Sequence, residues 1–191
     1  RRSSDLIMSV VEDDLELLTH LDLSKRNLKD LPESIGILKN LSVLKLSNNR
    51  LRKLPKAIGD LKNLRNLQCE NNLIEELPTS IGNLSNLMIL NLNVNRLKEL
   101  PKGFYDLKSL TRLTLAANRI ETLDKDFEKL SKLLYLSLET NELEDIPDIF
   151  EKMGQLYYLD LSFNHLTKLP DSLSKIKELE TLVLEGNNLT E

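Results

Sequence analysis

Aromatic residues are scarce in this sequence, and cysteine is almost missing. The chain has 191 residues, of which four are tyrosine, four are phenylalanine and none is tryptophan. Its single cysteine, Cys69, has no partner for an intramolecular disulfide, which is typical of proteins from a reducing compartment. Six glycines and six prolines are too few for a collagen-like or low-complexity chain. No apolar run approaches the roughly 18 residues that indicate a membrane span.

A large excess of charge of one sign is also missing. Lysine and arginine number 26 against 30 aspartate and glutamate residues, which gives a net charge of −4. Because this balance provides no overall attraction to nucleic acid or to an anionic membrane, we expect neither as a partner. Arg1 and Arg2 are followed by no long apolar stretch before the acidic residues at 12–14, so no signal peptide is visible. The expected location is the cytoplasm.

Leucine is abundant instead, with 46 copies in the chain. A leucine opens each of eight copies of one pattern, spaced 23 residues apart without an insertion, at Leu18, Leu41, Leu64, Leu87, Leu110, Leu133, Leu156 and Leu179. The copies fit L-x-x-L-x-L-x-x-N-x-L-x-x-L-P-x-x-(I/F)-x-x-L-x-x, and the eighth stops before its second half. This pattern contains the leucine-rich-repeat signature, which therefore covers residues 18–191.

The repeat predicts a solenoid, because one copy cannot bury its own apolar side chains. In the segment L-x-L the leucines point inward and the residues between them point outward, since side chains alternate along a strand. The second half has apolar residues three or four positions apart, which predicts about one helical turn or a 3-10 segment. We therefore expect an α/β leucine-rich-repeat horseshoe. Its parallel sheet lies on the concave face and its short return segments lie on the convex face.

Asparagine and proline mark fixed positions of the repeat. The asparagine follows the strand, where it can hydrogen-bond backbone groups that the turn would leave unpaired in the interior. Arg26 stands there in the first copy, which has no earlier repeat to satisfy. All six prolines share one later position, and Asp124 replaces the proline in the fifth copy. Cys69 replaces a core leucine, which predicts a small buried hydrophobic residue and no reactive thiol.

The segment before the repeats has a different pattern. Apolar residues recur there at helical spacing between acidic residues, at Leu6, Ile7, Val10, Val11 and Leu15. We predict an amphipathic helical cap over residues 1–17, because a solenoid exposes an apolar face at its end. Nothing comparable follows the eighth copy, so we expect the natural protein to continue beyond Glu191.

The second half of the repeat is specific enough to indicate a class of repeat. LPESIGIL (31–38), LPKAIGDL (54–61) and LPTSIGNL (77–84) resemble the motif of the intracellular 23-residue leucine-rich-repeat class. This class is similar to the repeat regions of Scribble and Erbin, of the Ras-suppressor and Sur-8 scaffolds, of plant Ras-group proteins and of many bacterial proteins. The resemblance implies a curved surface that binds another protein, often a small GTPase, a phosphatase or a polarity partner. It assigns no partner-contact residue.

The sequence offers few residues for catalysis. His20 belongs to the first copy and His165 to the seventh, roughly 29 Å away at about 4.8 Å per repeat, so they cannot share a metal or a triad. No glycine-rich phosphate loop and no metal-spaced set of cysteine and histidine is present. We therefore predict that these residues contain no enzyme active site and no cofactor or metal site.

Outward-facing strand residues predict the binding surface. Tyr135 and Tyr158 are neighbours across one strand spacing, next to Arg112, and aromatic residues beside an arginine are typical of interface hot spots. Packing of the two tyrosines on the sheet without any partner is the alternative, and both interpretations stay open. The predicted partner-binding residues are Arg112, Tyr135, Tyr158, Phe163, Ile89, Asp160 and Glu139.

Charge is uneven along the repeats. The second copy, 41–63, has six basic residues and one acidic residue, whereas the sixth, 133–155, has six acidic residues and one basic residue. This uneven charge can steer the approach of a partner, or let two copies of the chain associate head-to-tail or antiparallel. A solvated surface without either role is the simpler interpretation.

Three functions remain open at this point. The first is a non-enzymatic signalling scaffold that binds a partner protein on its concave face. The second is a sensor or substrate-recruiting segment of a larger signalling enzyme, such as a kinase, phosphatase, GTPase or ubiquitin ligase. The third is a secreted or surface receptor, against which the lack of cysteine-rich caps counts.

Overall fold

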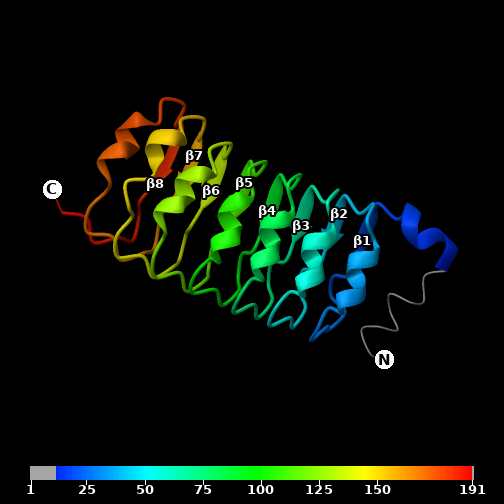
Figure 1. Cartoon of the computed structure of the whole chain (residues 1–191). Coiled ribbons are helices and arrows are strands. Elements are labelled where there is room, and N and C mark those ends of the chain that lie inside the picture. The colour runs from blue at the N-terminus through cyan, green and yellow to red at the C-terminus, as the bar shows by residue number, and fades with distance from the viewer. Residues whose placement is uncertain (1–11, 191) are drawn as a thin grey trace.

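The structure is a computed structural model that describes residues 12–190, and these residues form a solenoid of eight repeats (Figure 1). One sheet contains eight three-residue strands in sequence order: β1 (His20–Asp22), β2 (Val43–Lys45), β3 (Asn66–Gln68), β4 (Ile89–Asn91), β5 (Arg112–Thr114), β6 (Tyr135–Ser137), β7 (Tyr158–Asp160) and β8 (Thr181–Val183). Every neighbouring pair is parallel, and corresponding residues of successive repeats face each other, as Tyr135 faces Tyr158. The predicted parallel sheet is confirmed.

The chain returns along the opposite face through short 3-10 helices (Figure 1). They are η2 (Glu33–Ile37), η3 (Lys56–Asp60), η4 (Thr79–Asn83), η5 (Lys102–Asp106), η6 (Lys125–Lys129), η7 (Phe150–Lys152) and η8 (Asp171–Lys175). Five of them begin directly after a proline with an extended backbone, since proline fixes its own φ and provides no N–H group. At η6 the Asp124 carboxylate accepts a hydrogen bond from Asp126 N instead, at 2.8 Å.

Leucine side chains fill the space between the sheet and the return helices. Phe104, Phe127 and Phe150 occupy one row of this core and are fully buried. Cys69 is also fully buried, and burial raises the pKa of its thiol, so the prediction of a small buried hydrophobic residue is confirmed.

A ladder of buried asparagines joins each repeat to the one before it. Asn118 Nδ2 donates to the carbonyl oxygens of Leu92 at 2.9 Å and Leu115 at 3.0 Å, and its Oδ1 accepts from Leu97 N at 3.1 Å. The same bonds recur at the buried Asn49, Asn72, Asn95, Asn141 and Asn164 and at the half-buried Asn187. Because the partners lie in the preceding repeat, the first repeat needs no asparagine, which explains Arg26.

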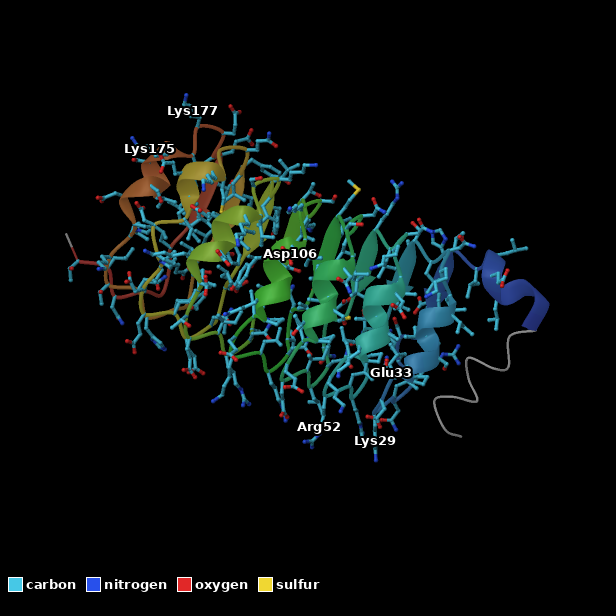
Figure 2. The ribbon with its side chains drawn as sticks, in the orientation of Figure 1. Lys29, Glu33, Arg52, Asp106, Lys175 and Lys177 are labelled. Atoms are coloured by element: carbon cyan, nitrogen blue, oxygen red, sulfur yellow. The ribbon has the colours of Figure 1, made fainter. Side chains whose placement is uncertain are left out.

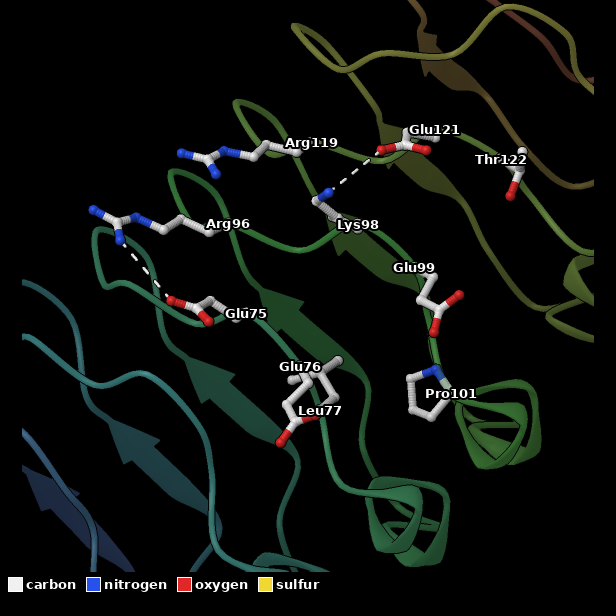
Figure 3. A pocket seen from close by; sticks show the side chains of 10 residues that line it. All are labelled: Glu75, Glu76, Leu77, Arg96, Lys98, Glu99, Pro101, Arg119, Glu121 and Thr122. Carbon is white, nitrogen blue, oxygen red and sulfur yellow. Dashed lines mark ion pairs between the residues drawn. The ribbon is translucent and has the colours of Figure 1, made fainter.

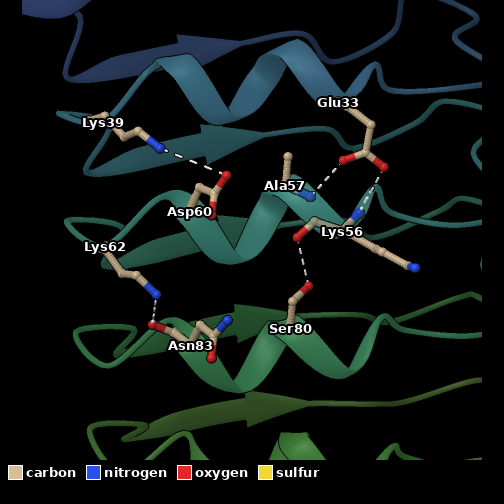
Figure 4. Close-up of polar contacts among 8 residues, drawn as sticks. All are labelled: Glu33, Lys39, Lys56, Ala57, Asp60, Lys62, Ser80 and Asn83. Carbon is tan, nitrogen blue, oxygen red and sulfur yellow. Dashed lines mark hydrogen bonds and ion pairs between the residues drawn. The ribbon is translucent and has the colours of Figure 1, made fainter.

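Polar side chains also tie neighbouring return segments together on the outer face (Figure 4). The Glu33 carboxylate accepts hydrogen bonds from Lys56 N at 3.2 Å and from Ala57 N at 2.7 Å, two amides at the start of η3 that have no partner within the helix. Ser80 Oγ in η4 donates to the carbonyl oxygen of Lys56 at 2.7 Å. Adjacent repeats are therefore linked on both faces of the core.

The predicted N-terminal cap falls mostly outside the described residues, among them Leu6, Ile7, Val10 and Val11. Its last part, Glu12–Leu17, forms the 3-10 helix η1, and Leu15 is buried in the leucine core. A cap over residues 1–17 therefore stays a prediction. Within residues 12–190 no helix is long and apolar enough to cross a bilayer.

Candidate partner-binding surface

Three of the predicted residues form one continuous stack on the outward face of the sheet. The Arg112 guanidinium carbon lies 3.8 Å from the centroid of the Tyr135 ring. The rings of Tyr135 and Tyr158 are parallel within 2° and their centroids are 4.1 Å apart. They come from β5, β6 and β7, whose register sets equivalent residues opposite each other at a spacing of about 4.8 Å. Their predicted proximity is confirmed, and we refer to Arg112, Tyr135 and Tyr158 as the tyrosine stack.

Asp160 lies two residues after Tyr158 in β7, and its carboxylate already accepts hydrogen bonds from its own repeat. It is 7% exposed, and its Oδ1 accepts from Ser162 N at 2.9 Å and from Ser162 Oγ at 2.5 Å. The Tyr158 hydroxyl donates to its Oδ2 at 3.3 Å. Asp160 is therefore suited to hold Tyr158 and the turn after β7 in position, and less suited to a direct contact with a partner.

The environment of the stack changes the acidity of Tyr158. Desolvation raises the pKa of Tyr158 to about 12, and the hydrogen bond with Tyr135 and the charge of Asp160 act in the same direction. Desolvation and the charge of Asp124 likewise raise the pKa of Tyr105 to about 12.

We expect two of the four tyrosines to ionise late in an absorbance titration. An unperturbed tyrosine ionises near a pKa of about 10, so the raised values favour the neutral form in the folded protein. The resulting stability is present below pH ~10 and is lost as the pH rises toward ~12. Tyr158→Phe should halve the late phase of the titration, whereas an unchanged late phase would contradict this assignment.

The other predicted residues lie around the stack without joining it. Ile89 in β4 is half-buried and faces Arg112, so it continues the same column. Phe163 is 48% exposed and covers Gly186, where an added Cβ would lie 2.5 Å from the phenyl ring. Glu139 is half-buried after β6. Within residues 12–190 no aromatic or ion-pair contact joins Phe163 or Glu139 to the tyrosine stack.

The residue directly before the repeat position of the asparagine, which Arg26 occupies in the first repeat, adopts a left-handed backbone in every repeat. These residues are Lys25, Asn48, Asn71, Val94, Ala117, Thr140, Phe163 and Gly186, with φ between 53° and 68°. Glycine and asparagine tolerate this conformation, whereas bulky or β-branched residues are strained in it. Val94 and Phe163 are also about half exposed, at 49% and 48%. The turn that all repeats share imposes this backbone, so what distinguishes Val94 and Phe163 is their exposed apolar side chains; Val94 was not among the residues predicted from the sequence.

We expect Val94→Asn to raise the free energy of unfolding by about 1 kcal/mol, because asparagine relieves the left-handed strain of a β-branched residue. Urea denaturation measures the change. Val94→Ala is the matched control, since it removes the exposed side chain and keeps a non-glycine Cβ. If the asparagine variant were no more stable than the alanine variant, backbone strain would not explain the difference.

A row of exposed apolar side chains was also missed. Met88, Leu134 and Tyr157 directly precede β4, β6 and β7 and are 41%, 36% and 40% exposed. The Tyr157 ring meets Tyr135 edge-on, with centroids 6.4 Å apart. The sequence does indicate this row, because other repeats have polar residues, such as Ser42 and Thr111, at the position where these three repeats have apolar ones. Met88, Leu134 and Tyr157, here the apolar row, extend the surface along the edge where strands begin.

The opposite edge carries a groove of about 690 Å³ with mixed charge (Figure 3). Arg96 pairs with Glu75 at 3.9 Å, and Lys98 pairs with Glu121 at 3.8 Å. These exposed ion pairs link neighbouring repeats. Because the positive and negative charges within each pair cancel, the groove favours neither an anionic nor a cationic ligand. Figure 2 shows basic side chains near both ends of the solenoid, with Lys29 and Arg52 near the first repeats and Lys175 and Lys177 near the last.

The described residues provide no assembled metal site. No group of three or more histidine, cysteine, aspartate or glutamate residues within 12–190 lies close enough to hold an ion. His20 and His165 are exposed in the first and seventh repeats. That the chain is no enzyme stays a prediction.

Comparisons with known proteins agree with this architecture. The family model for leucine-rich repeats matches residues 16–74, 69–120, 108–166 and 147–189. A leucine-rich-repeat protein of Leptospira interrogans is 39% identical, with a TM-score of 0.89 over 93% of this chain and 46% of that chain. The plant peptide hormone receptor RGFR1, solved in complex with RGF2, is 30% identical, with a TM-score of 0.80 over 89% of this chain and 28% of that chain.

An internalin, inlF of Listeria monocytogenes, has the same fold at 24% identity, with a TM-score of 0.73 over 86% of this chain and 47% of that chain. This chain thus spans less than half the length of each of these structures. A search of curated proteins found no match. Because the family model matches nearly the whole solenoid, the chain belongs to the leucine-rich-repeat family.

Proposed function

We propose that this chain is a non-enzymatic protein-interaction module that binds a partner protein on its concave face, with the tyrosine stack at the centre of the contact. The observation that carries the proposal is the stacking of Arg112, Tyr135 and Tyr158 on one another on the outward face of the sheet. Rings already held in one orientation lose little conformational entropy on binding, and aromatic and arginine side chains dominate interface hot spots.

The surroundings of the stack support the same proposal. Val94 and Phe163 are exposed and strained at a repeat position where Asn48 and Asn71 stand in other repeats. The apolar row adds exposed apolar surface at the opposite ends of the same strands. Contiguous apolar surface rimmed by polar residues is typical of protein interaction sites.

The resemblance to the intracellular repeat class supports a cytoplasmic signalling scaffold. Its motif, in LPESIGIL, LPKAIGDL and LPTSIGNL, is similar to that of Scribble, Erbin and the Sur-8 and Ras-suppressor scaffolds. A small GTPase, a phosphatase or another signalling protein is accordingly the partner we propose.

A second candidate is a sensing segment of a longer protein, either a signalling enzyme or a receptor. The similarity to a plant peptide hormone receptor, and the fact that this chain spans 28% of it, favour this candidate. The binding surface would be the same in both cases. The domain composition of the complete protein and its position in the cell distinguish the two.

Affinity capture from the native lysate tests the proposal. The bait is the chain in three forms: wild type, Tyr135→Ala/Tyr158→Ala, and the matched control Val43→Ala/Asn66→Ala in the same outward column. We expect the wild type and the control to retain the same partner and the tyrosine variant to lose it. Equal capture by all three folded baits would overturn the proposal.

A further inference from the structure

A shallow pocket of about 540 Å³ lies beside the tyrosine stack, where the last strands begin. It is lined by Leu134, Gln155, Tyr157, Glu178 and Glu180. Leu134, Tyr157 and Glu180 hold the same position in three consecutive repeats, each directly before its strand. Backbone hydrogen bonds fix this row, from Tyr157 N to the Leu134 carbonyl and from Glu180 N to the Tyr157 carbonyl, both at 2.9 Å.

One side of the pocket is apolar and aromatic. Leu134 and Tyr157 are 36% and 40% exposed. The Tyr157 ring is supported edge-on by Tyr135, which itself stacks on Tyr158. An aromatic face held in this way, next to an aliphatic side chain, suits the methylene stem and the flat head of a cationic side chain.

The other side of the pocket is acidic. Glu178 and Glu180 are exposed, and neither forms an ion pair with any residue in the described range 12–190. In the groove on the opposite edge, by contrast, Glu75 and Glu121 are paired within the chain. Two available carboxylates next to an exposed ring complement a positive charge.

We propose that this pocket binds an arginine side chain of the partner protein, an inference that rests on the proposed function and assigns a chemistry to one end of the same surface. The chain contains the corresponding contact itself, since Arg112 stacks on Tyr135 at 3.8 Å. A planar guanidinium stacks on Tyr157 while its N–H groups donate to Glu178 and Glu180. Lysine has a compact, strongly hydrated ammonium group and fits this combination less well.

Titration with N-acetyl-arginine-N-methylamide, followed by NMR, tests the pocket without knowledge of the partner. We expect saturable shifts of the Leu134 methyl groups and the Tyr157 ring. The lysine analogue should bind more weakly, and the uncharged norleucine analogue should show no saturation. An arginine titration without saturation, or equal binding of the lysine or norleucine analogue, would overturn the assignment.

Charge variants complete the test. Glu178→Gln/Glu180→Gln should weaken arginine binding at least about five-fold, which corresponds to about 1 kcal/mol for an ion pair at an exposed site. Glu142→Gln/Glu144→Gln, which makes the same charge change at exposed residues outside the pocket, should leave binding unchanged. Undiminished binding by the pocket variant would contradict the proposal.

The two proposals can fail separately. If the tyrosine variant loses its partner in the capture experiment but arginine does not bind, the proposed function stands and the arginine pocket is wrong. If arginine binds at the pocket but the tyrosine variant retains its partner, the proposed contact at the stack is wrong.

Discussion

Asn118→Ala should lower the free energy of unfolding by about 3 kcal/mol, because it leaves one buried backbone N–H group unpaired and removes two further buried hydrogen bonds. The variant removes the side-chain acceptor of Leu97 N. It also removes one of the two asparagine donors to each of the Leu92 and Leu115 carbonyl groups, which keep Asn95 and Asn141 respectively. Because these groups belong to two adjacent repeats, the loss acts on the interface between repeats, which is the unit of stability in a solenoid. Urea denaturation followed by circular dichroism measures the change.

Asn86→Ala provides the matched control for the asparagine ladder. Asn86 is exposed and donates one hydrogen bond, to the Lys62 carbonyl at 2.8 Å. Its removal should cost about 1 kcal/mol or less, as expected for one exposed hydrogen bond. If Asn118→Ala cost no more than Asn86→Ala, the buried asparagines would not be what joins the repeats.

Gly103→Ala should cost about 3 kcal/mol, at the upper end of the range for overpacking, because the return helices η4 and η5 approach backbone to backbone. A Cβ at Gly103 would lie 2.1 Å from the carbonyl oxygen of Thr79. In the same pair of helices a Cβ at Gly82 would lie 2.0 Å from the carbonyl oxygen of Gly103. Since both obstacles are backbone atoms, no side-chain rotation relieves the contact, and the two helices have to separate.

Gly154→Ala tests whether glycine loss alone accounts for this effect. No heavy atom lies within 4 Å of a Cβ built at Gly154. Alanine there should leave the free energy of unfolding unchanged or raise it slightly, because it restricts the unfolded chain. Equal destabilisation by the two variants would contradict a specific close approach at Gly103.

The architecture was predictable because each repeat position has the same environment in every copy. The leucines of L-x-L point inward, and a constant period of 23 residues sets Tyr135 opposite Tyr158 without any slip in register. The recurring asparagine predicted an inward polar side chain bonded to backbone groups. Arg26 replaces it in the first repeat, where no preceding repeat has groups for it to bond. The tyrosine stack followed from this register and from the identity of three residues.

Other parts of the surface depend on side-chain detail that periodicity does not contain. That Asp160 contacts a partner stays a prediction, but the hydrogen bonds of its carboxylate are not contained in the repeat pattern: Ser162 in the turn after β7 donates to Oδ1, and Tyr158 within β7 donates to Oδ2. The left-handed backbone at Val94 is imposed by the turn and has no apolar pattern that would reveal it. The apolar row stands one residue before the strands, outside the columns of outward-facing strand residues from which the binding surface was predicted.

The most direct test of the central claim is the affinity of the captured partner for the tyrosine stack. The partner is titrated calorimetrically into the wild type, into Tyr135→Ala/Tyr158→Ala and into the control Val43→Ala/Asn66→Ala. If each tyrosine contributes about 2 kcal/mol and the two contributions add, the double variant should bind roughly a thousand-fold more weakly while the control keeps its affinity. An unchanged dissociation constant for the tyrosine variant, with an unchanged melting temperature, would contradict the account.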